Sequence, residues 1–258
     1  MCLGCLDYGF WVRMATPRLA RSARLRDGST RIYETADGTI YPSVTSVIDQ
    51  LDKPALIYWA AKMSAEYATL HREALADLPA DDAITLIKGN WRKARDKAGA
   101  RGTRIHEYLE DPTSTPTLEA RPYLEQAQIF LEANDLEVST TEVSLSHPGE
   151  GYAGTADVIA TSNGDRYVID WKTGKGIYDS HALQVVALGE ATHQLDEYGG
   201  EHPSTPIDFG VVVRLAPGEH ETHLIQKGTE QWVTAWDAFR GMIPVWQWKR
   251  EVKEIWNE

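Results

Sequence analysis

Two short segments, Gly154-Thr155-Ala156-Asp157-Val158-Ile159 and Val168-Ile169-Asp170-Trp171-Lys172, decide the interpretation of this sequence. Both are rich in small or β-branched apolar residues, and the turn Asn163-Gly164-Asp165 separates them, which is typical of antiparallel strands joined by a hairpin. Each segment carries an aspartate among apolar neighbours. Because an unpaired buried carboxylate is costly, each aspartate needs a hydrogen-bonding partner or a cation.

Asp170 and Lys172 are expected on one face of their strand, with Trp171 on the other, because side chains at positions i and i+2 share a face. Two neighbouring carboxylates offer hard oxygen ligands, which favour Mg²⁺ or Mn²⁺. A lysine beside such a metal can orient a water molecule and neutralise charge that develops on a phosphate. Taken alone, an Asp-x-Lys triplet is more often an ordinary ion pair than part of a metal site. The residues around it therefore have to distinguish the two interpretations.

That pattern resembles the RecB-like branch of the PD-(D/E)XK nucleases. In chain order, the resemblance rests on Gly102-Thr103-Arg104-Ile105-His106, the two strand segments, Thr173-Gly174-Lys175 and Gln184. Tyr41-Pro42-Ser43-Val44-Thr45 is similar to the N-terminal signature of phage-borne members, which extends the resemblance over residues 40–190. The resemblance implies a mixed α+β (α/β) fold with a restriction-endonuclease-like core. In that core a central mixed β-sheet is flanked by helices, and helical additions lie at both ends.

The resemblance also implies a set of site residues. A Mg²⁺ or Mn²⁺ ion would be bound by His106, Asp157, Asp170 and the backbone carbonyl of Trp171. Lys172 would be the catalytic lysine, acting with Asp157 and Asp170. Two further acidic residues, Glu142 and Glu110, are expected around the metal and its water molecules. For Glu110, a solvated helix end is the competing interpretation.

Two features depart from the family pattern. The branch usually has a tyrosine four residues after its glutamine, but Leu188 stands there, so the DNA contact of that tyrosine is not expected. Cys2 and Cys5 are the only cysteines, so we expect no iron–sulfur cluster of the four-cysteine kind found in some relatives. A half zinc site or redox pair at these cysteines would lack a second CxxC motif. Met14 resembles an alternative start, which would place both cysteines in a leader.

Charge is distributed unevenly along the chain. The net charge is −12, yet residues 1–104 hold 16 Lys and Arg against 12 Asp and Glu, and residues 105–258 hold 10 against 26. The region from Ile84 to Glu110 is helical in pattern and strongly basic. A nucleic-acid surface is therefore expected in the first part of the chain, with a solvated helical face as the alternative. The residues expected to contact DNA are Arg92, Lys93, Arg101, Arg104, Lys175 and Gln184.

Periodicity and turn residues predict the remaining elements. Residues 1–36 are interpreted as a leader and hairpin, and residues 37–258 as a single nuclease domain. The alternating run that begins at Arg31 and the turn at Asp37-Gly38 predict the small hairpin. A helix is expected after Pro42, introduced by a Ser or Thr cap. Further helices are expected at 54–76, at 84–110 with a break at Gly99 and Gly102, at 118–136, at 180–197, and at 229–256 with an interruption near Gly241 and Pro244. Strands are expected at 138–145, 154–160 and 166–171, as an antiparallel meander, and at 209–215. The tail tryptophans are expected to pack in the core, with a stacking platform for single-stranded bases as the alternative.

The sequence has no apolar run long enough to span a bilayer, so we expect a soluble, intracellular protein. If the protein is phage-encoded, this is the host cytoplasm. The leading hypothesis is a DNA exonuclease or structure-selective endonuclease in phage recombination or DNA processing. It would act on single strands or duplex ends, with a single-strand annealing or recombination protein as partner. The alternatives are an inactive nucleic-acid-binding module of the same fold and a metal-dependent hydrolase of a small phosphoester.

Overall fold

A computed structural model describes residues 23–24, 30–111 and 114–256 of the chain. Two compact units make up the structure: Met1–Gln50 with Ile105–Glu258, and Leu51–Arg104. The CxxC motif at Cys2 and Cys5 and the alternative start at Met14 lie outside the described residues.

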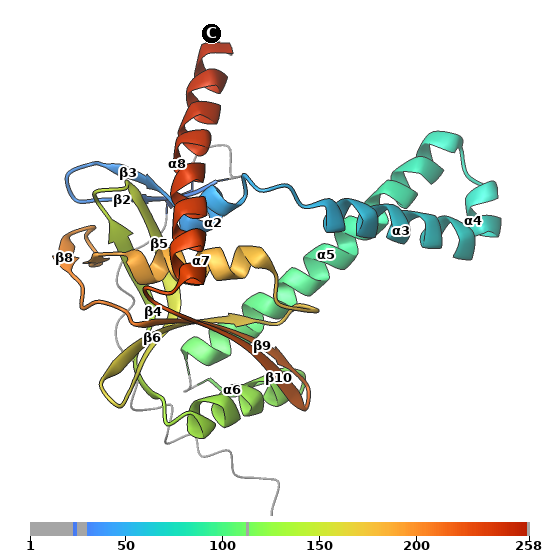
Figure 1. The fold of residues 1–258 in the computed structure, drawn as a ribbon. Coiled ribbons are helices and arrows are strands. Elements are labelled where there is room, and N and C mark those ends of the chain that lie inside the picture. Colours follow the sequence, from blue (N-terminus) through green and yellow to red (C-terminus); the bar gives the residue numbers. More distant parts are fainter. Residues whose placement is uncertain (1–22, 25–29, 112–113, 257–258) are drawn as a thin grey trace, which may run out of the picture. The chain divides into compact units, whose positions relative to one another are not determined.

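A seven-stranded mixed sheet forms the centre of the first unit (Figure 1). Its strand order is β10-β9-β6-β5-β4-β7-β8. The strands are β4 (Glu137–His147), β5 (Tyr152–Ser162), β6 (Asp165–Lys172), β7 (His193–Leu195), β8 (Glu201–Pro203), β9 (Phe209–Ala216) and β10 (Glu219–Gln226). Within this sheet β6 and β9 pair in parallel, and the other neighbouring strands pair in antiparallel fashion. The expected meander of β4, β5 and β6 is confirmed, as is the apolar strand β9.

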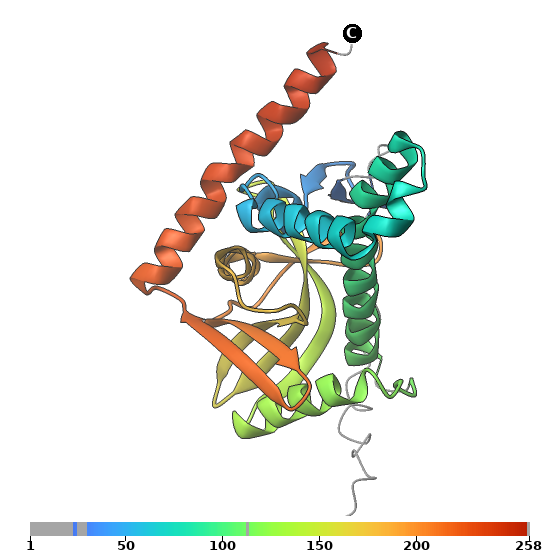
Figure 2. The ribbon, with the colours of Figure 1, turned by 90° about the vertical axis from the view of Figure 1, so that its right-hand side faces the viewer.

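Helices cover both faces of this sheet (Figures 1 and 2). On one face, α6 (Arg121–Ala133) and the last residues of α5 (Ala80–Glu110) bury an apolar cluster that includes Ile169 and Trp171. On the other face, α2 (Val44–Ile48), α7 (Asp179–Glu190) and the first part of α8 (Glu230–Trp256) enclose a second cluster that includes Val168. Figure 2 shows α7 end-on against the sheet. The structure is therefore mixed α+β, with a central mixed sheet flanked by helices.

Gly154 explains how closely two of these helices approach the sheet. A Cβ atom at this position would lie 2.8 Å from Val44 Cγ2 and 2.9 Å from Leu188 Cδ2. Both distances are shorter than the van der Waals contact distance between two carbon atoms, so a side chain here would push α2 and α7 away from β5. The glycine that opens the first deciding segment thus serves helix–sheet packing.

The expected hairpin around Asp37-Gly38 is confirmed. Strands β2 (Arg31–Glu34) and β3 (Ile40–Pro42) pair in a small sheet with β1 (Ala23–Arg24), so the two strands lie on either side of the boundary expected at residue 36. The expected helix after Pro42 is also confirmed. Ser43 caps α2, because its Oγ accepts a hydrogen bond from the Ser46 N–H at 3.0 Å.

Three expectations about helices are wrong. α5 runs for 31 residues through Gly99 and Gly102, because a glycine costs only about 1 kcal/mol in a helix and does not forbid its dihedral angles. α8 also continues through Gly241 and Pro244, where the buried side chains of Phe239, Ile243 and Trp246 anchor both sides of the proline.

The third wrong expectation concerns α7, which ends at Glu190 rather than Glu197. Beyond it, the Thr192 N–H donates to the Ser146 carbonyl, and β7 pairs with β4. Strand β10, whose residues are mostly polar, was not predicted at all.

The second unit consists of α3 (Pro54–Leu70), α4 (Arg72–Ala76) and the N-terminal part of α5. Trp59 meets Trp91 edge-to-face, with ring centroids 6.4 Å apart. Asn90 Nδ2 donates to the Met63 carbonyl at 3.2 Å. The helical expectation for residues 54–76 is confirmed, except for a short break at His71.

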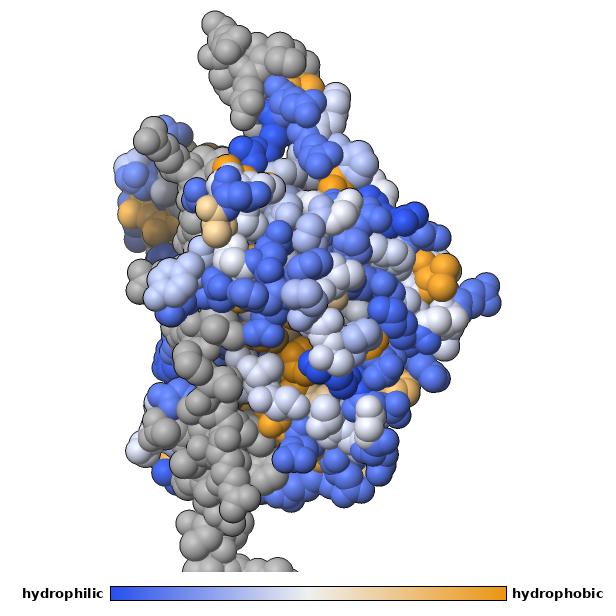
Figure 3. All heavy atoms as spheres, turned by 90° about the vertical axis from the view of Figure 1, so that its left-hand side faces the viewer, coloured by the Kyte–Doolittle hydropathy of each residue, from blue (hydrophilic) through white to orange (hydrophobic). Residues whose placement is uncertain are grey.

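The tail tryptophans divide between core and surface. Trp232 and Trp246 are buried, as expected, but Trp248 is 59% exposed. On the face drawn in Figure 3, the described side chains are mostly hydrophilic and the hydrophobic ones are scattered. None of the helices among the described residues has both the length and the apolar character needed to cross a membrane.

Candidate active site

Asp157 and Asp170 lie where strands β5 and β6 separate. The last paired residues of the two strands are Val158 and Ile169. Asp157 and Asp170 are each one residue beyond that pair. Across the gap, the Trp171 N–H donates to Asp157 Oδ2 at 2.8 Å. The Asp157 carboxylate therefore bridges the two strands in place of a ladder hydrogen bond.

Asp170, Lys172 and Gln184 form a closed ring of contacts. Lys172 Nζ lies 2.6 Å from Asp170 Oδ2 and donates to Gln184 Oε1 at 3.1 Å, while Gln184 Nε2 donates to Asp170 Oδ1 at 2.7 Å. Gln184 comes from α7, which covers this face of the sheet. Trp171 points to the opposite face and meets Phe130 edge-to-face at 5.9 Å. The expected sharing of a face by Asp170 and Lys172 is confirmed.

Burial controls the electrostatics of this ring. The Asp170 side chain is 2% exposed, and this burial raises the pKa of its carboxyl; the Asp157 charge adds to the rise, while the Lys172 ammonium opposes it. Burial also disfavours the Lys172 ammonium, but the adjacent Asp170 carboxylate outweighs it and the pKa of Lys172 is raised. We conclude from the 2.6 Å contact that Lys172 keeps its proton.

His106 lies beside the other aspartate. It projects from the last turns of α5, and its Nδ1 is 3.5 Å from Asp157 Oδ2. The side chains of both residues are largely buried, at 26% and 15% exposed. The structure thus brings His106 and Asp157 together, and separately Asp170, Lys172 and Gln184.

These groups do not converge as a preformed metal cage. Among the described residues, no group of three or more His, Cys, Asp or Glu side chains is placed to hold a metal ion. Asp170 Oδ2 is buried, and the Lys172 ammonium at 2.6 Å is its counter-ion among the described residues. A buried carboxylate oxygen of this kind is suited to a cation.

The two further acidic candidates lie next to these residues in the fold. The β4–β5 register pairs Thr141 with Val158 and Val143 with Ala156, which places Glu142 opposite Asp157. Glu142 has a left-handed backbone, with φ 50°. Glu110 is the last residue of α5, one turn beyond His106.

Most of the expected DNA-contacting residues lie in the second unit. Arg92, Lys93 and Arg104 are exposed on α5, and Arg101 is half-buried. The guanidinium of Arg92 lies 5.7 Å from the Trp91 ring centroid. Arg95 lies over the same ring at 5.2 Å. In the first unit, Lys175 is exposed on the loop after β6.

His181 is a residue that sequence reasoning missed. It lies in the first turn of α7, three residues before Gln184, and its Nδ1 accepts the Tyr178 N–H at 3.2 Å. Burial and the nearby Lys172 ammonium lower the pKa of His181 to about 4. Its spacing from Gln184 was the available signal, because residues three apart share a side of a helix.

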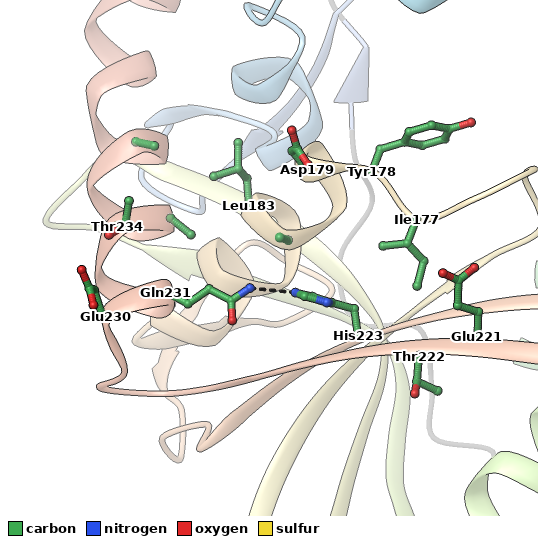
Figure 4. Close-up of a pocket in the computed structure, with 13 residues that line it drawn as sticks. Ile177, Tyr178, Asp179, Leu183, Glu221, Thr222, His223, Glu230, Gln231 and Thr234 are labelled. Carbon is green, nitrogen blue, oxygen red and sulfur yellow. Dashed lines mark hydrogen bonds between the residues drawn. The ribbon is translucent and has the colours of Figure 1, made fainter.

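A cavity of about 760 Å³ lies elsewhere in the first unit, between α7, β10 and α8 (Figure 4). Its polar rim includes Asp179, Glu221 and Glu230, and its wall includes Leu183. Gln231 Nε2 donates to His223 Nε2 across one side at 2.8 Å. None of the expected metal ligands lines this cavity, so it is distinct from the candidate active site.

No family model and no curated protein matches this sequence. Among solved structures, the chain is similar to one titled "Crystal structure of SSO0001". The two are 17% identical, the match covers 80% of this chain and 76% of that one, and the TM-score is 0.33.

Proposed function

We propose that this chain is a metal-dependent nuclease of the PD-(D/E)XK class that hydrolyses phosphodiester bonds in DNA. One observation carries the proposal. Asp157 and Asp170 each lie one residue beyond the last β5–β6 pair, Val158 and Ile169, and Lys172 shares the face of Asp170. Two carboxylates and a buried ammonium at one strand junction supply the groups that hydrolysis of a phosphodiester needs.

The donor set fits a hard divalent cation. His106, Asp157, Asp170 and the carbonyl of Trp171 would hold Mg²⁺ or Mn²⁺, and the burial of the Asp170 carboxyl, which disfavours an uncompensated charge, supports this assignment. When bound, such a metal lowers the pKa of a water molecule and neutralises charge on a phosphate.

Each protein group has a separate task in this proposal. Lys172, whose raised pKa keeps it protonated, orients the attacking water and neutralises charge on a phosphate oxygen. Gln184 contacts both Asp170 and Lys172, so it holds the two charged groups in register. The Trp171 N–H fixes the orientation of the Asp157 carboxylate.

The basic part of α5 supports DNA as the substrate. The net charge of −12 would repel DNA, but the local positive charge of Arg92, Lys93, Arg101 and Arg104 would bind its phosphates. Lys175 adds a cation on the loop after β6. The substrate would be a single strand or a duplex end. The proposal includes an annealing or recombination protein as partner.

A second candidate is a nucleic-acid-binding module of the same fold without catalysis. The closed Asp170–Lys172–Gln184 ring, and the lack of a preformed metal group among the described residues, favour it. In that case the ring would be a structural ion pair, and DNA binding would not depend on a divalent cation.

One experiment separates the two candidates. The full chain is incubated with end-labelled linear duplex, circular duplex and single-stranded DNA, under Mg²⁺, Mn²⁺ or chelator. The variants are Asp170→Asn and Lys172→Met, and the matched controls are Asp165→Asn on β6 and Lys249→Met on α8, both exposed.

A nuclease cleaves one of these substrates with metal only, and both site variants abolish cleavage while the controls retain it. Binding without cleavage under every metal condition supports the inactive module. Full cleavage by either site variant contradicts the proposed roles of Asp170 and Lys172.

A further inference from the structure

One side of α7 faces away from the cavity and toward the candidate active site. Asp179, Ala182 and Leu183 line the cavity, and Figure 4 shows Asp179 and Leu183 there. At 3.6 residues per turn, His181 and Gln184 project from the opposite side of the helix. Gln184 reaches both Asp170 and Lys172 from that side. His181 therefore comes from the same side of α7, one turn before a residue of the Asp170–Lys172–Gln184 ring.

The hydrogen bond of His181 Nδ1 determines which nitrogen of the neutral imidazole carries the proton. Nδ1 accepts the Tyr178 N–H at 3.2 Å, so it carries no proton. The neutral imidazole then has its proton on Nε2, which is a donor. Burial and the Lys172 ammonium hold the pKa of His181 at about 4, so the imidazole is neutral across ordinary working pH. Among the described residues, Nε2 makes no hydrogen bond.

We propose that His181 is a further catalytic residue, whose Nε2–H donates a hydrogen bond to a phosphate oxygen of the DNA beside Lys172. The inference rests on the proposed nuclease function. The histidine transfers no proton: the water oxygen bonds to phosphorus and releases a proton to the solvent, and the bond from phosphorus to the leaving oxygen breaks with its electron pair on that oxygen. The leaving oxygen takes a proton from the solvent, and Nε2 keeps its hydrogen throughout. A fixed neutral donor stabilises charge on the phosphate without repelling Lys172.

The competing role of His181 is purely structural. Its Nδ1 satisfies a backbone N–H at the start of α7, which by itself stabilises the helix. Two substitutions separate the roles. His181→Asn keeps an acceptor near the Nδ1 position and removes the donor at Nε2. His181→Gln keeps a donor near the Nε2 position and removes the acceptor.

The test measures kcat and KM of the full chain on end-labelled DNA with Mg²⁺, together with the thermal unfolding midpoint of each variant. We expect His181→Asn to lower kcat about 100-fold with KM changed less than about twofold, the effect of removing one donor to a developing negative charge. We expect His181→Gln to retain most of kcat. ¹⁵N NMR of the metal-free protein, assigned by comparison with His181→Gln, should show the proton of this imidazole on Nε2.

Four results would overturn the inference. Wild-type kcat in His181→Asn, or a kcat for His181→Gln as low as that of His181→Asn at equal thermal stability, removes the donor role and leaves the nuclease proposal intact. An NMR signal with the proton on Nδ1 does the same. Absence of cleavage by the wild-type chain on every DNA and metal refutes both proposals together.

Discussion

The Trp171 backbone N–H donates to Asp157 Oδ2 at 2.8 Å, across the point where β5 and β6 separate. One carboxylate oxygen thus joins the two segments that decide the fold, and it also lies 3.5 Å from His106 Nδ1. The local structure and the proposed chemistry depend on the same side chain.

Replacement of Asp157 should separate these two tasks. Asp157→Asn keeps an oxygen that accepts the Trp171 N–H but lacks the charge, whereas Asp157→Ala leaves that N–H without its partner. Both variants should lose DNA cleavage, and the alanine variant should be less stable than the asparagine variant by about 1–3 kcal/mol. Urea unfolding and a cleavage assay check this; equal stability of the two variants would contradict the structural part of the prediction.

Gln184 should contribute to stability as well as to the site. Gln184→Met removes the donor to Asp170 Oδ1 and the acceptor of Lys172, both in a largely buried ring. A buried group left without its partner costs about 1–3 kcal/mol, so the free energy of unfolding should fall by that amount. Gln247→Met, at an exposed position on α8, is the matched control and should change it little. The prediction is wrong if both substitutions have the same effect.

The alternation and turn pattern predicted the centre of the fold well. Strand periodicity placed Asp170 and Lys172 on one face and Trp171 on the other, because that inference needs only local geometry. Helix boundaries were less predictable. Pro244 does not end α8, since the burial of Phe239 and Trp246 on either side is a tertiary effect that no local pattern contains.

The sequence predicted which residues lie near one another better than it predicted how their side chains are arranged. The pairing of His106 with Asp157 follows from the family resemblance, and the structure brings the two together. The ring through Gln184 was not foreseen, because its side chain was expected to contact DNA rather than Asp170. Strand β10 was missed because only Leu224 and Ile225 interrupt its polar residues, so its pairing with β9 rather than its own pattern determines it.

Gly189, the glycine of α7, should not tolerate a side chain. A Cβ atom there would overlap Trp232 Cη2, and the indole is held by its Nε1 hydrogen bond to Glu190 at 2.6 Å. Gly189→Ala should therefore lower the free energy of unfolding by about 1–3 kcal/mol through overpacking. Gly241→Ala is the control, since its Cβ atom would meet nothing within 4 Å and alanine is the better helix former. Chemical denaturation of both variants checks the contrast, and a stabilised Gly189→Ala protein would refute it.

His147 should make the stability of the first unit dependent on pH. Its ring lies 5.7 Å from the Tyr152 ring and 5.8 Å from the Trp236 ring, and its Nδ1 accepts the Glu150 N–H at 3.1 Å. Burial lowers the pKa of His147 in the folded protein. In the unfolded chain this histidine is protonated near its ordinary pKa of about 6.5, at a pH where it is still neutral in the folded protein. The unfolded state then binds more protons, and stability should fall as pH drops below about 6.5, with no effect of this group above it.

The measurement for His147 is the thermal midpoint between about pH 5 and pH 8, compared between the wild type and His147→Phe. The phenylalanine ring retains the stacking but does not titrate. The variant lacks the hydrogen bond from the Glu150 N–H at every pH. This loss lowers its thermal midpoint by the same amount throughout and does not change the pH dependence of the midpoint. The wild type should show the steeper decline toward low pH, and parallel curves for the two proteins would show that His147 does not contribute.

The basic side chains of α5 should increase the salt dependence of DNA binding. Arg92, Lys93 and Arg95 are exposed, and the two arginines lie over Trp91. Each neutralised phosphate releases condensed counterions, so replacing all three residues with glutamine should weaken binding. The slope of log K against log salt should fall by about 0.7–0.9 for each phosphate that is no longer neutralised. Binding is measured in chelator to exclude cleavage. Lys62→Gln, whose lysine pairs with Glu66 at 3.7 Å, controls for removal of a cation in the same unit. An unchanged slope in the triple variant would mean that these side chains form a solvated helical face and do not contact the phosphates.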